Sequence, residues 1–128
     1  ILLGLTSNPG SQDFQLLKTS RNLLFQDVLE RSKSWKNSNQ LMYVIGATQA
    51  TFLQVVREIL PDSFLLIPGV GAQGGSLDEV CKYGMNSSYG LLINSSRGII
   101  YASDHVDFAE QAKQKAIELQ TQMARYIN

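Results

Sequence analysis

Residues 67–75 read IPGVGAQGG, in which an apolar run ends at a proline and four glycines follow within seven residues. The run begins at Phe64 and has the length and composition of a buried strand. Because glycine adopts positive φ and lets other groups approach the backbone closely, the loop after this strand either turns a tight corner or holds a ligand. Whether the loop is a tight turn or a ligand-binding loop has to be inferred from the surrounding sequence.

Other short apolar runs have strand character and do not alternate between apolar and polar residues, which is typical of a parallel sheet covered on its faces. These runs are residues 1–6, 42–47 and 91–93. Apolar residues spaced by three or four positions predict amphipathic helices after each strand. The predicted helices are residues 13–35, 50–60 and 77–83, and a last one that begins near Asp104 or Asp107, where a carboxylate can cap free amides, and runs to residue 127.

The order is therefore a strand followed by a helix, repeated four times, without a linker or a low-complexity segment. Repeated βα units predict an α/β fold with a parallel sheet and right-handed crossovers. A closed barrel of this kind needs eight units and about 250 residues, so four units predict an open sheet or half of a barrel. We treat residues 1–128 as one unit. Its start on Ile1, inside a strand-like run and without a leader, suggests a chain cut at its N-terminus.

The composition excludes several classes of protein. The 128 residues are 44% hydrophobic and 17% charged with zero net charge, and no apolar run is long enough to span a membrane. Mixed charges at zero net charge also argue against a nucleic-acid partner. A single Cys81 and a single His105 cannot form a disulfide or a tetrahedral zinc site, so we expect a cytoplasmic protein without a metal, in which Cys81 is a buried small hydrophobe.

Ligands of parallel α/β folds bind at the carboxyl ends of the strands, so the residues there are the candidate site. These stretches are residues 6–8, 48–49, 68–75 and 94–98. In the third stretch, Gly71, Gly74 and Gly75 can take positive φ and present backbone amides, and Gln73 offers a side-chain amide. In the fourth, Arg97 stands among small hydrogen-bond donors, an arrangement suited to a dianion such as phosphate.

Each of these signals has an ordinary structural explanation. Ser7 can cap the first helix and Thr48 the second, and an arginine after a strand is often solvated or paired with a carboxylate. We expect His105 and Trp35 to be structural and Tyr101 to pack. No carboxylate or lysine stands at any strand end, although acid–base or electrostatic catalysis would need one there. The residues at the strand ends are therefore suited to binding a ligand, and they offer no evident catalytic group.

Four motifs in this order, LTSNPGS (5–11), VIGATQ (44–49), IPGVGAQGG (67–75) and NSSRGIIYA (94–102), closely resemble the C-terminal half of orotidine 5′-phosphate decarboxylase. That family consists of TIM-barrel enzymes of pyrimidine biosynthesis that use no cofactor. The resemblance covers all 128 residues and implies that the four strands are strands five to eight of a (β/α)8 barrel.

The resemblance also implies a set of substrate-binding residues and no catalytic ones. They are Ser7, Pro68, Val70, Gln73, Ser96 and Arg97. Ser7 matches the serine that hydrogen-bonds the pyrimidine, Gln73 the loop glutamine that reaches the 5′-phosphate, and Arg97 the arginine that pairs with it. The backbone at Ser96 assists with the phosphate, although serines here replace a Val-Gly pair of many relatives. Pro68 and Val70 line the wall near the base and the ribose phosphate.

The implied reaction converts orotidine 5′-monophosphate to uridine 5′-monophosphate without a metal or cofactor. The family's catalytic Lys and Asp network lies on the N-terminal strands, and one Asp comes from the partner in a homodimer, so this chain alone should be inactive. Its two edge strands would be open, and we expect it to pair with another copy. Two alternatives remain: another phosphate-binding barrel enzyme that acts on a sugar phosphate, and a small flavodoxin-like binding domain complete at 128 residues.

Overall fold

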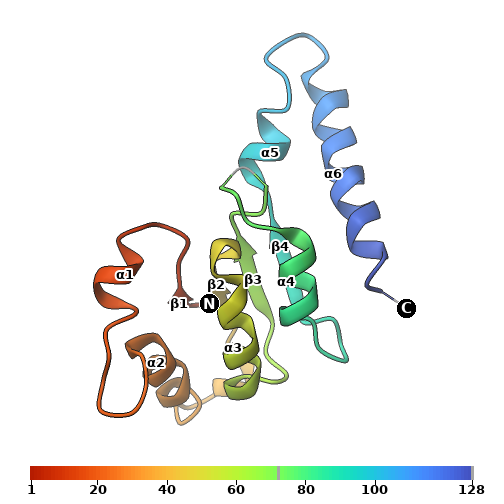
Figure 1. Cartoon of the computed structure of the whole chain (residues 1–128). Coiled ribbons are helices and arrows are strands. Elements are labelled where there is room, and N and C mark those ends of the chain that lie inside the picture. The colour runs from red at the N-terminus through yellow and green to blue at the C-terminus, as the bar shows by residue number, and fades with distance from the viewer. Residues whose placement is uncertain (72, 128) are drawn as a thin grey trace.

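A computed structural model describes residues 1–71 and 73–127 and contains one sheet of four parallel strands in the order β1-β2-β3-β4 (Figure 1). The strands are β1 Leu2–Leu5, β2 Tyr43–Ile45, β3 Leu65–Pro68 and β4 Leu91–Asn94. The helices are α1 Ser11–Phe14, α2 Leu24–Ser32, η1 Ser38–Gln40, η2 Ala47–Phe52, α3 Leu53–Ile59, α4 Leu77–Gly84, α5 Ser96–Ile100 and α6 Phe108–Ala124. The four predicted strands and the parallel sheet are confirmed.

One face of the sheet forms the floor of the hydrophobic core. Alternate strand residues, Leu5, Tyr43, Ile45, Leu65 and Ile67, are at most 1% exposed. The helices α2, α3 and α4 lie side by side over this face and contact one another in that order (Figure 1). Because successive side chains of a strand point to opposite faces, this pattern leaves the other face of the sheet for a different role.

The second face carries a row of apolar side chains with little cover. Leu3 pairs with Val44, Val44 with Leu66, and Leu66 with Leu92, so one residue from each strand lies at the same level. Leu3 and Leu92, at the two edges, are 63% and 51% exposed. In a closed barrel such a row would point into the interior. The described sheet is therefore open along β1, along β4 and over this face.

The prediction of one helix over residues 13–35 is wrong. The chain instead forms α1, a tight turn and α2. The turn is closed by Thr19, whose backbone N–H donates to the Asn22 carbonyl at 2.8 Å and whose Oγ1 accepts from the Asn22 N–H at 3.1 Å. Short hydroxyl and amide side chains compete with helical hydrogen bonds in this way, and the apolar spacing alone does not reveal it. Phe14 and Leu17, assigned to the apolar stripe, are 69% and 51% exposed.

The remaining helices follow the prediction more closely. Residues 50–60 form the end of η2 and then α3, and α4 ends at Gly84 as expected. The last helix begins directly after Asp107, but the carboxylate of Asp107 accepts hydrogen bonds from the side chains of Ser103 and Gln111 and does not cap the free amides. These two hydrogen bonds lower the pKa of Asp107.

Two single-residue expectations have opposite outcomes. Cys81 on α4 is only 2% exposed, as predicted, and burial, followed by the nearby charge of Asp78, raises the pKa of its thiol. Tyr101 was expected to pack, but it follows α5 and is 78% exposed. Within residues 1–71 and 73–127, no helix is both long and apolar enough to cross a membrane.

Arg57 on α3 holds the amino-terminal end of the sheet together. Its Nε donates to the carbonyl of Gly84 at the end of α4, and its Nη2 donates to the carbonyl of Gly90, just before β4, at 2.9 Å. Its Nη1 donates to the carbonyls of Leu60 at 3.2 Å and Ser63 at 2.7 Å, which precede β3. One partly buried guanidinium thus links two helices with the starts of two strands, and burial lowers its pKa.

Candidate functional site

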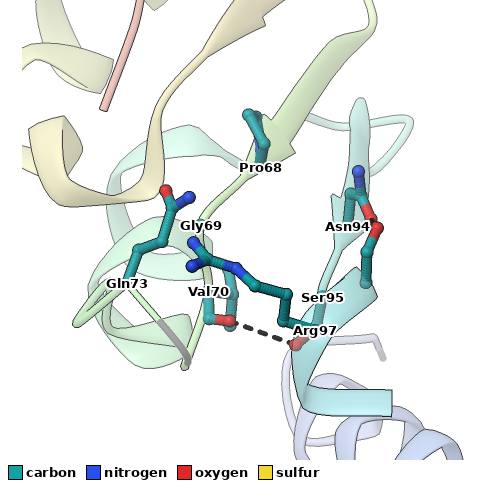
Figure 2. Close-up of a pocket in the computed structure, with 8 residues that line it drawn as sticks. Pro68, Gly69, Val70, Gln73, Asn94, Ser95 and Arg97 are labelled. Carbon is teal, nitrogen blue, oxygen red and sulfur yellow. Dashed lines mark hydrogen bonds between the residues drawn. The ribbon is translucent and has the colours of Figure 1, made fainter. Parts of the chain in front are cut away.

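The carboxyl ends of β3 and β4 meet at a small polar pocket of about 120 Å³. The residues that line it come from the loop after β3 and from the junction of β4 with α5 (Figure 2). They are Pro68, Gly69, Val70, Gln73, Asn94, Ser95, Ser96 and Arg97. Of the six predicted binding residues, five therefore line one pocket although they are up to 29 residues apart in the sequence. The sixth, Ser7, lies beside it.

The glycine loop after β3 has a different construction from the one predicted. Positive φ occurs at Gly69, Gly71 and Gly74, with values of 94°, 74° and 86°, and not at Gly75. The N–H of Gly71 donates to the Gly75 carbonyl at 3.0 Å, that of Gly74 to Gly71 at 2.8 Å, and that of Gly75 to Gly69 at 3.2 Å. The N–H groups of these three glycines therefore donate to carbonyls of the loop itself. The expectation that they are presented to a phosphate is wrong.

Gly75 has a packing role instead. A Cβ atom at this position would lie 2.3 Å from the Cβ of Ala47 and 2.8 Å from the carbonyl oxygen of Gly69. Any side chain would push the loop away from η2 or break its closure. The loop thus turns a tight corner and presents the side chain of Gln73 to the pocket.

The side chains of Gln73 and Arg97 enter the pocket from opposite sides and point toward each other over Gly69 and Val70 (Figure 2). Both residues are exposed. Arg97 belongs to the short helix α5, where a loop was expected. Within the described part of the chain, no carboxylate or carbonyl pairs with Arg97. A guanidinium fork facing a carboxamide across a small pocket can bind a planar or tetrahedral anion from two sides.

Ser7 reaches the pocket from the end of β1. Its Oγ donates to the Pro68 carbonyl at 3.5 Å and lies 3.0 Å from where a Cβ of Gly69 would be, while the Oε1 of Gln73 lies 2.6 Å from the same point. Gly69 thus gives space to both side chains. On the other side, a Cβ on Gly46 would meet the Ser7 Oγ at 2.2 Å. Two glycines therefore allow Ser7 to approach Gln73.

The capping alternative for the two strand-end hydroxyls is wrong. The first helix is preceded by Gly10 and receives no side-chain cap, so Ser7 is not its cap. Thr48 lies inside η2, and its Oγ1 donates to the Ser7 carbonyl at 3.4 Å. Neither hydroxyl is used to begin a helix, which leaves Ser7 available to the pocket.

The junction of β4 and α5 is held by two serine hydroxyls. Ser95 donates to the carbonyl of Val70 at 3.1 Å, and Ser96 donates to the Oδ1 of Asn94 at 2.7 Å. Gly69, Asn94 and Ser95 also line the pocket. They belong to the strand-end stretches 68–75 and 94–98 of the candidate site, but they are not among the six predicted binding residues.

The described lining contains one cationic side chain, no carboxylate and no lysine. Within residues 1–71 and 73–127, no group of three or more His, Cys, Asp and Glu side chains is placed to hold a metal. The pocket can therefore bind and orient an anion, but the residues present offer no general acid or base. Catalytic chemistry at this site would need groups from outside this set.

Four parallel βα units, with the polar pocket at the carboxyl ends of the last two strands, place the chain in the class of TIM-barrel proteins, of which it forms part of the barrel. No protein-family model matches the chain. The orotidine 5′-phosphate decarboxylase of Flavobacterium johnsoniae is 59% identical over 128 residues, which are 100% of this chain and 47% of that protein. The chain belongs to the orotidine 5′-phosphate decarboxylase family and matches the C-terminal half of its members.

Solved structures agree with this assignment. The UMP synthase of Leishmania donovani superposes with a TM-score of 0.77 at 37% identity, covering 92% of this chain and 26% of that one. The OMP decarboxylase of the same organism gives a TM-score of 0.74 at 33% identity, covering 93% of this chain and 46% of that one. The chain thus spans about half the length of the curated relatives it matches.

Proposed function

We propose that this chain supplies the phosphate- and pyrimidine-binding half of a decarboxylase, a carbon–carbon lyase that converts orotidine 5′-monophosphate to uridine 5′-monophosphate. The enzyme would act in pyrimidine biosynthesis in the cytoplasm and would need no metal or cofactor. Residues 1–128 would act as one unit within it. The flavodoxin-like alternative loses its support because the chain belongs to a TIM-barrel family.

The observation that carries this proposal is the pair formed by Gln73 and Arg97 across the pocket, with Ser7 beside Gln73. Arg97 has no acceptor among the described residues, and a phosphate dianion would offer its fork-shaped guanidinium two acceptor oxygens. Gln73 can donate a third hydrogen bond from the opposite side. Ser7 then stands at the end of the pocket nearest to β1, where a hydroxyl can donate to or accept from a pyrimidine ring.

The same residues suggest how a pocket whose described lining has no acid or base group could contribute to catalysis. Binding energy from a phosphate remote from the reacting carbon lowers the barrier when it is used to close a loop and orient the substrate. The groups that stabilise the reacting carbon would come from the other half of the barrel. Alone, this chain should bind nucleotide weakly and should not turn over. We propose that the complete enzyme is a homodimer.

A chimera tests this proposal directly. The N-terminal half of the Flavobacterium johnsoniae relative, joined in frame before Ile1, would complete the barrel because the two proteins are 59% identical over the shared half. We expect the chimera to consume orotidine 5′-monophosphate, followed by its absorbance, and the 128-residue chain alone to leave it unchanged. Arg97→Ala in the chimera should raise KM, whereas Ser34→Ala, an exposed serine after α2, should have no effect.

Ligand preference separates this function from that of a sugar-phosphate enzyme with a similar phosphate pocket. The chimera should bind uridine 5′-monophosphate much more tightly than ribose 5-phosphate, because Ser7 adds a contact to the base. A folded chimera that binds both ligands equally and leaves orotidine 5′-monophosphate unchanged would refute the proposal in favour of the sugar-phosphate alternative.

A further inference from the structure

We propose that Ser95 is a positioning residue that sets the separation between Gln73 and Arg97, and that it does so through its hydrogen bond to Val70. This inference rests on the proposed function, since it assumes that the two side chains bind one phosphate. Ser95 stands between β4 and α5, two residues before Arg97, and the dashed line in Figure 2 marks its hydrogen bond to Val70 in the loop after β3.

The hydroxyl of Ser95 is used in an unusual way. Ser95 occupies the N-cap position of α5, where a serine ordinarily accepts a hydrogen bond from an amide of the first helical turn. Here it makes no such bond. Its Oγ instead crosses to the neighbouring loop and donates to the Val70 carbonyl at 3.1 Å. The Ser95 hydroxyl therefore does not cap α5 but connects α5 with the loop after β3, and both of these segments line the pocket.

The space around this hydroxyl is narrow. A Cβ atom on Gly98 would lie 2.8 Å from the Ser95 Oγ, and one on Gly71 would lie 3.9 Å from it. A side chain at Gly98 would therefore displace the Ser95 hydroxyl, whereas the distance at Gly71 is an ordinary van der Waals contact. The absence of a side chain at Gly98 gives the Ser95 hydroxyl the space from which it reaches Val70.

The loop has few other ties to α5. Its amides at Gly71, Gly74 and Gly75 are bonded within the loop, and the ladder between β3 and β4 ends at the pair Pro68 and Asn94. Val70 is 3% exposed, so removing its donor would leave a carbonyl in a largely buried residue without a partner. The loop that carries Gln73 would then shift relative to the helix that carries Arg97.

The test uses the chimera with the Flavobacterium johnsoniae N-terminal half and its Ser95→Ala, Ser95→Thr and Ser34→Ala variants. Affinities for uridine 5′-monophosphate and uridine are measured by NMR titration, and their ratio gives the gain from the phosphate. We expect Ser95→Ala to lower this ratio about tenfold, because the loop that carries Gln73 and the helix that carries Arg97 would no longer be held at one separation. Ser95→Thr keeps the donor and should restore the ratio. Ser34 also donates to a carbonyl, that of Arg31, but lies far from the pocket and should be neutral.

Hydrogen exchange in the chimera without ligand provides a second measurement. Ser95→Ala should speed the exchange of the Gly71, Gly74 and Gly75 amides about tenfold, and Ser34→Ala should not. If the unmutated chimera binds uridine 5′-monophosphate no better than uridine, the proposed phosphate site is wrong, and the exchange rates still decide the role of Ser95. If Ser95→Ala keeps both the phosphate gain and the exchange rates of the unmutated chimera, the positioning role is overturned while the proposed function stands.

Discussion

Two arginines at opposite ends of the sheet have opposite surroundings. Arg57, at the amino-terminal end, donates to backbone carbonyls of the segments before β3, before β4 and at the end of α4. Arg97, at the carboxyl end, faces a pocket and has no protein acceptor within the described residues. The side chain is the same, but one guanidinium donates to several backbone carbonyls, whereas the other has no acceptor among the described residues.

This difference matches the division of labour in TIM barrels, where the bottom face stabilises the fold and the top face carries the site. A guanidinium that donates to several carbonyls adds further hydrogen bonds between segments that the sheet and the packing of α3 on α4 already hold together. An unpaired guanidinium contributes little to stability and is kept in position by the elements around it. Stability and binding in this chain should therefore respond to different mutations.

The largest expected effect is the loss of stability in Arg57→Ala. Removing the side chain leaves the carbonyls of Gly84, Leu60 and Ser63 without the Arg57 donor, whereas the Gly90 carbonyl keeps the N–H of Leu65. The free energy of unfolding should fall by about 3 kcal/mol. Urea unfolding followed by circular dichroism measures this value. Arg97→Ala serves as the matched control and should change it by less than about 0.5 kcal/mol. An equal loss of unfolding free energy in Arg57→Ala and Arg97→Ala would contradict the prediction that only Arg57 stabilises the fold.

The converse experiment concerns binding. Arg97→Ala should weaken uridine 5′-monophosphate by about 2 kcal/mol, or roughly thirtyfold, because a charge-assisted contact to the phosphate is lost. Isothermal titration of the chimera with the Flavobacterium relative gives the affinity. Arg97→Lys should recover only part of it, since lysine lacks the fork geometry. An Arg97→Ala variant with unchanged affinity would mean that the phosphate lies elsewhere.

The open face of the sheet should have a smaller effect, on association and not on folding. With Leu3 and Leu92 largely exposed, we expect the 128-residue chain to associate with another copy at high micromolar concentration. Leu92→Lys should reduce this association and leave the unfolding midpoint almost unchanged. Light scattering across a concentration series measures the mass. A monodisperse monomer of the parent chain would contradict the prediction.

The smallest effect should be seen at Cys81, which reports on the opening of α4. Burial, and then Asp78, raises the pKa of the thiol, so less of it is thiolate at pH 8 than in an exposed cysteine, and alkylation should be slow and should accelerate as the pH rises. Because Arg57 holds the end of α4, Arg57→Ala should speed alkylation by iodoacetamide, whereas Arg97→Ala should not. Equal rates in the two variants would show that α4 opens independently of Arg57.

Much of the fold was readable in the sequence because its strands are continuous apolar runs and its breaks are marked by glycine and proline. The four strands, the parallel sheet and the end of α4 at Gly84 follow from those signals. The break between α1 and α2 does not, because Thr19 and Asn22 form the turn through side-chain hydrogen bonds that leave the apolar spacing almost unchanged. The apolar periodicity indicates which face of a helix is buried, but it does not indicate where a side chain forms hydrogen bonds that compete with those of the helix.

The site divides in the same way. The sequence by itself determined which groups are available, since the residues at the strand ends include Ser7, Gln73 and Arg97 and no carboxylate or lysine. Only the tertiary structure decided which hydrogen bonds these groups make. The glycine N–H groups close the loop, and the Ser95 hydroxyl donates to the Val70 carbonyl. Arg57 donates to backbone carbonyls, whereas Arg97 has no acceptor among the described residues. The physical reason is that chemical type is local to a residue, whereas a hydrogen bond depends on which distant segments the fold brings within about 3 Å.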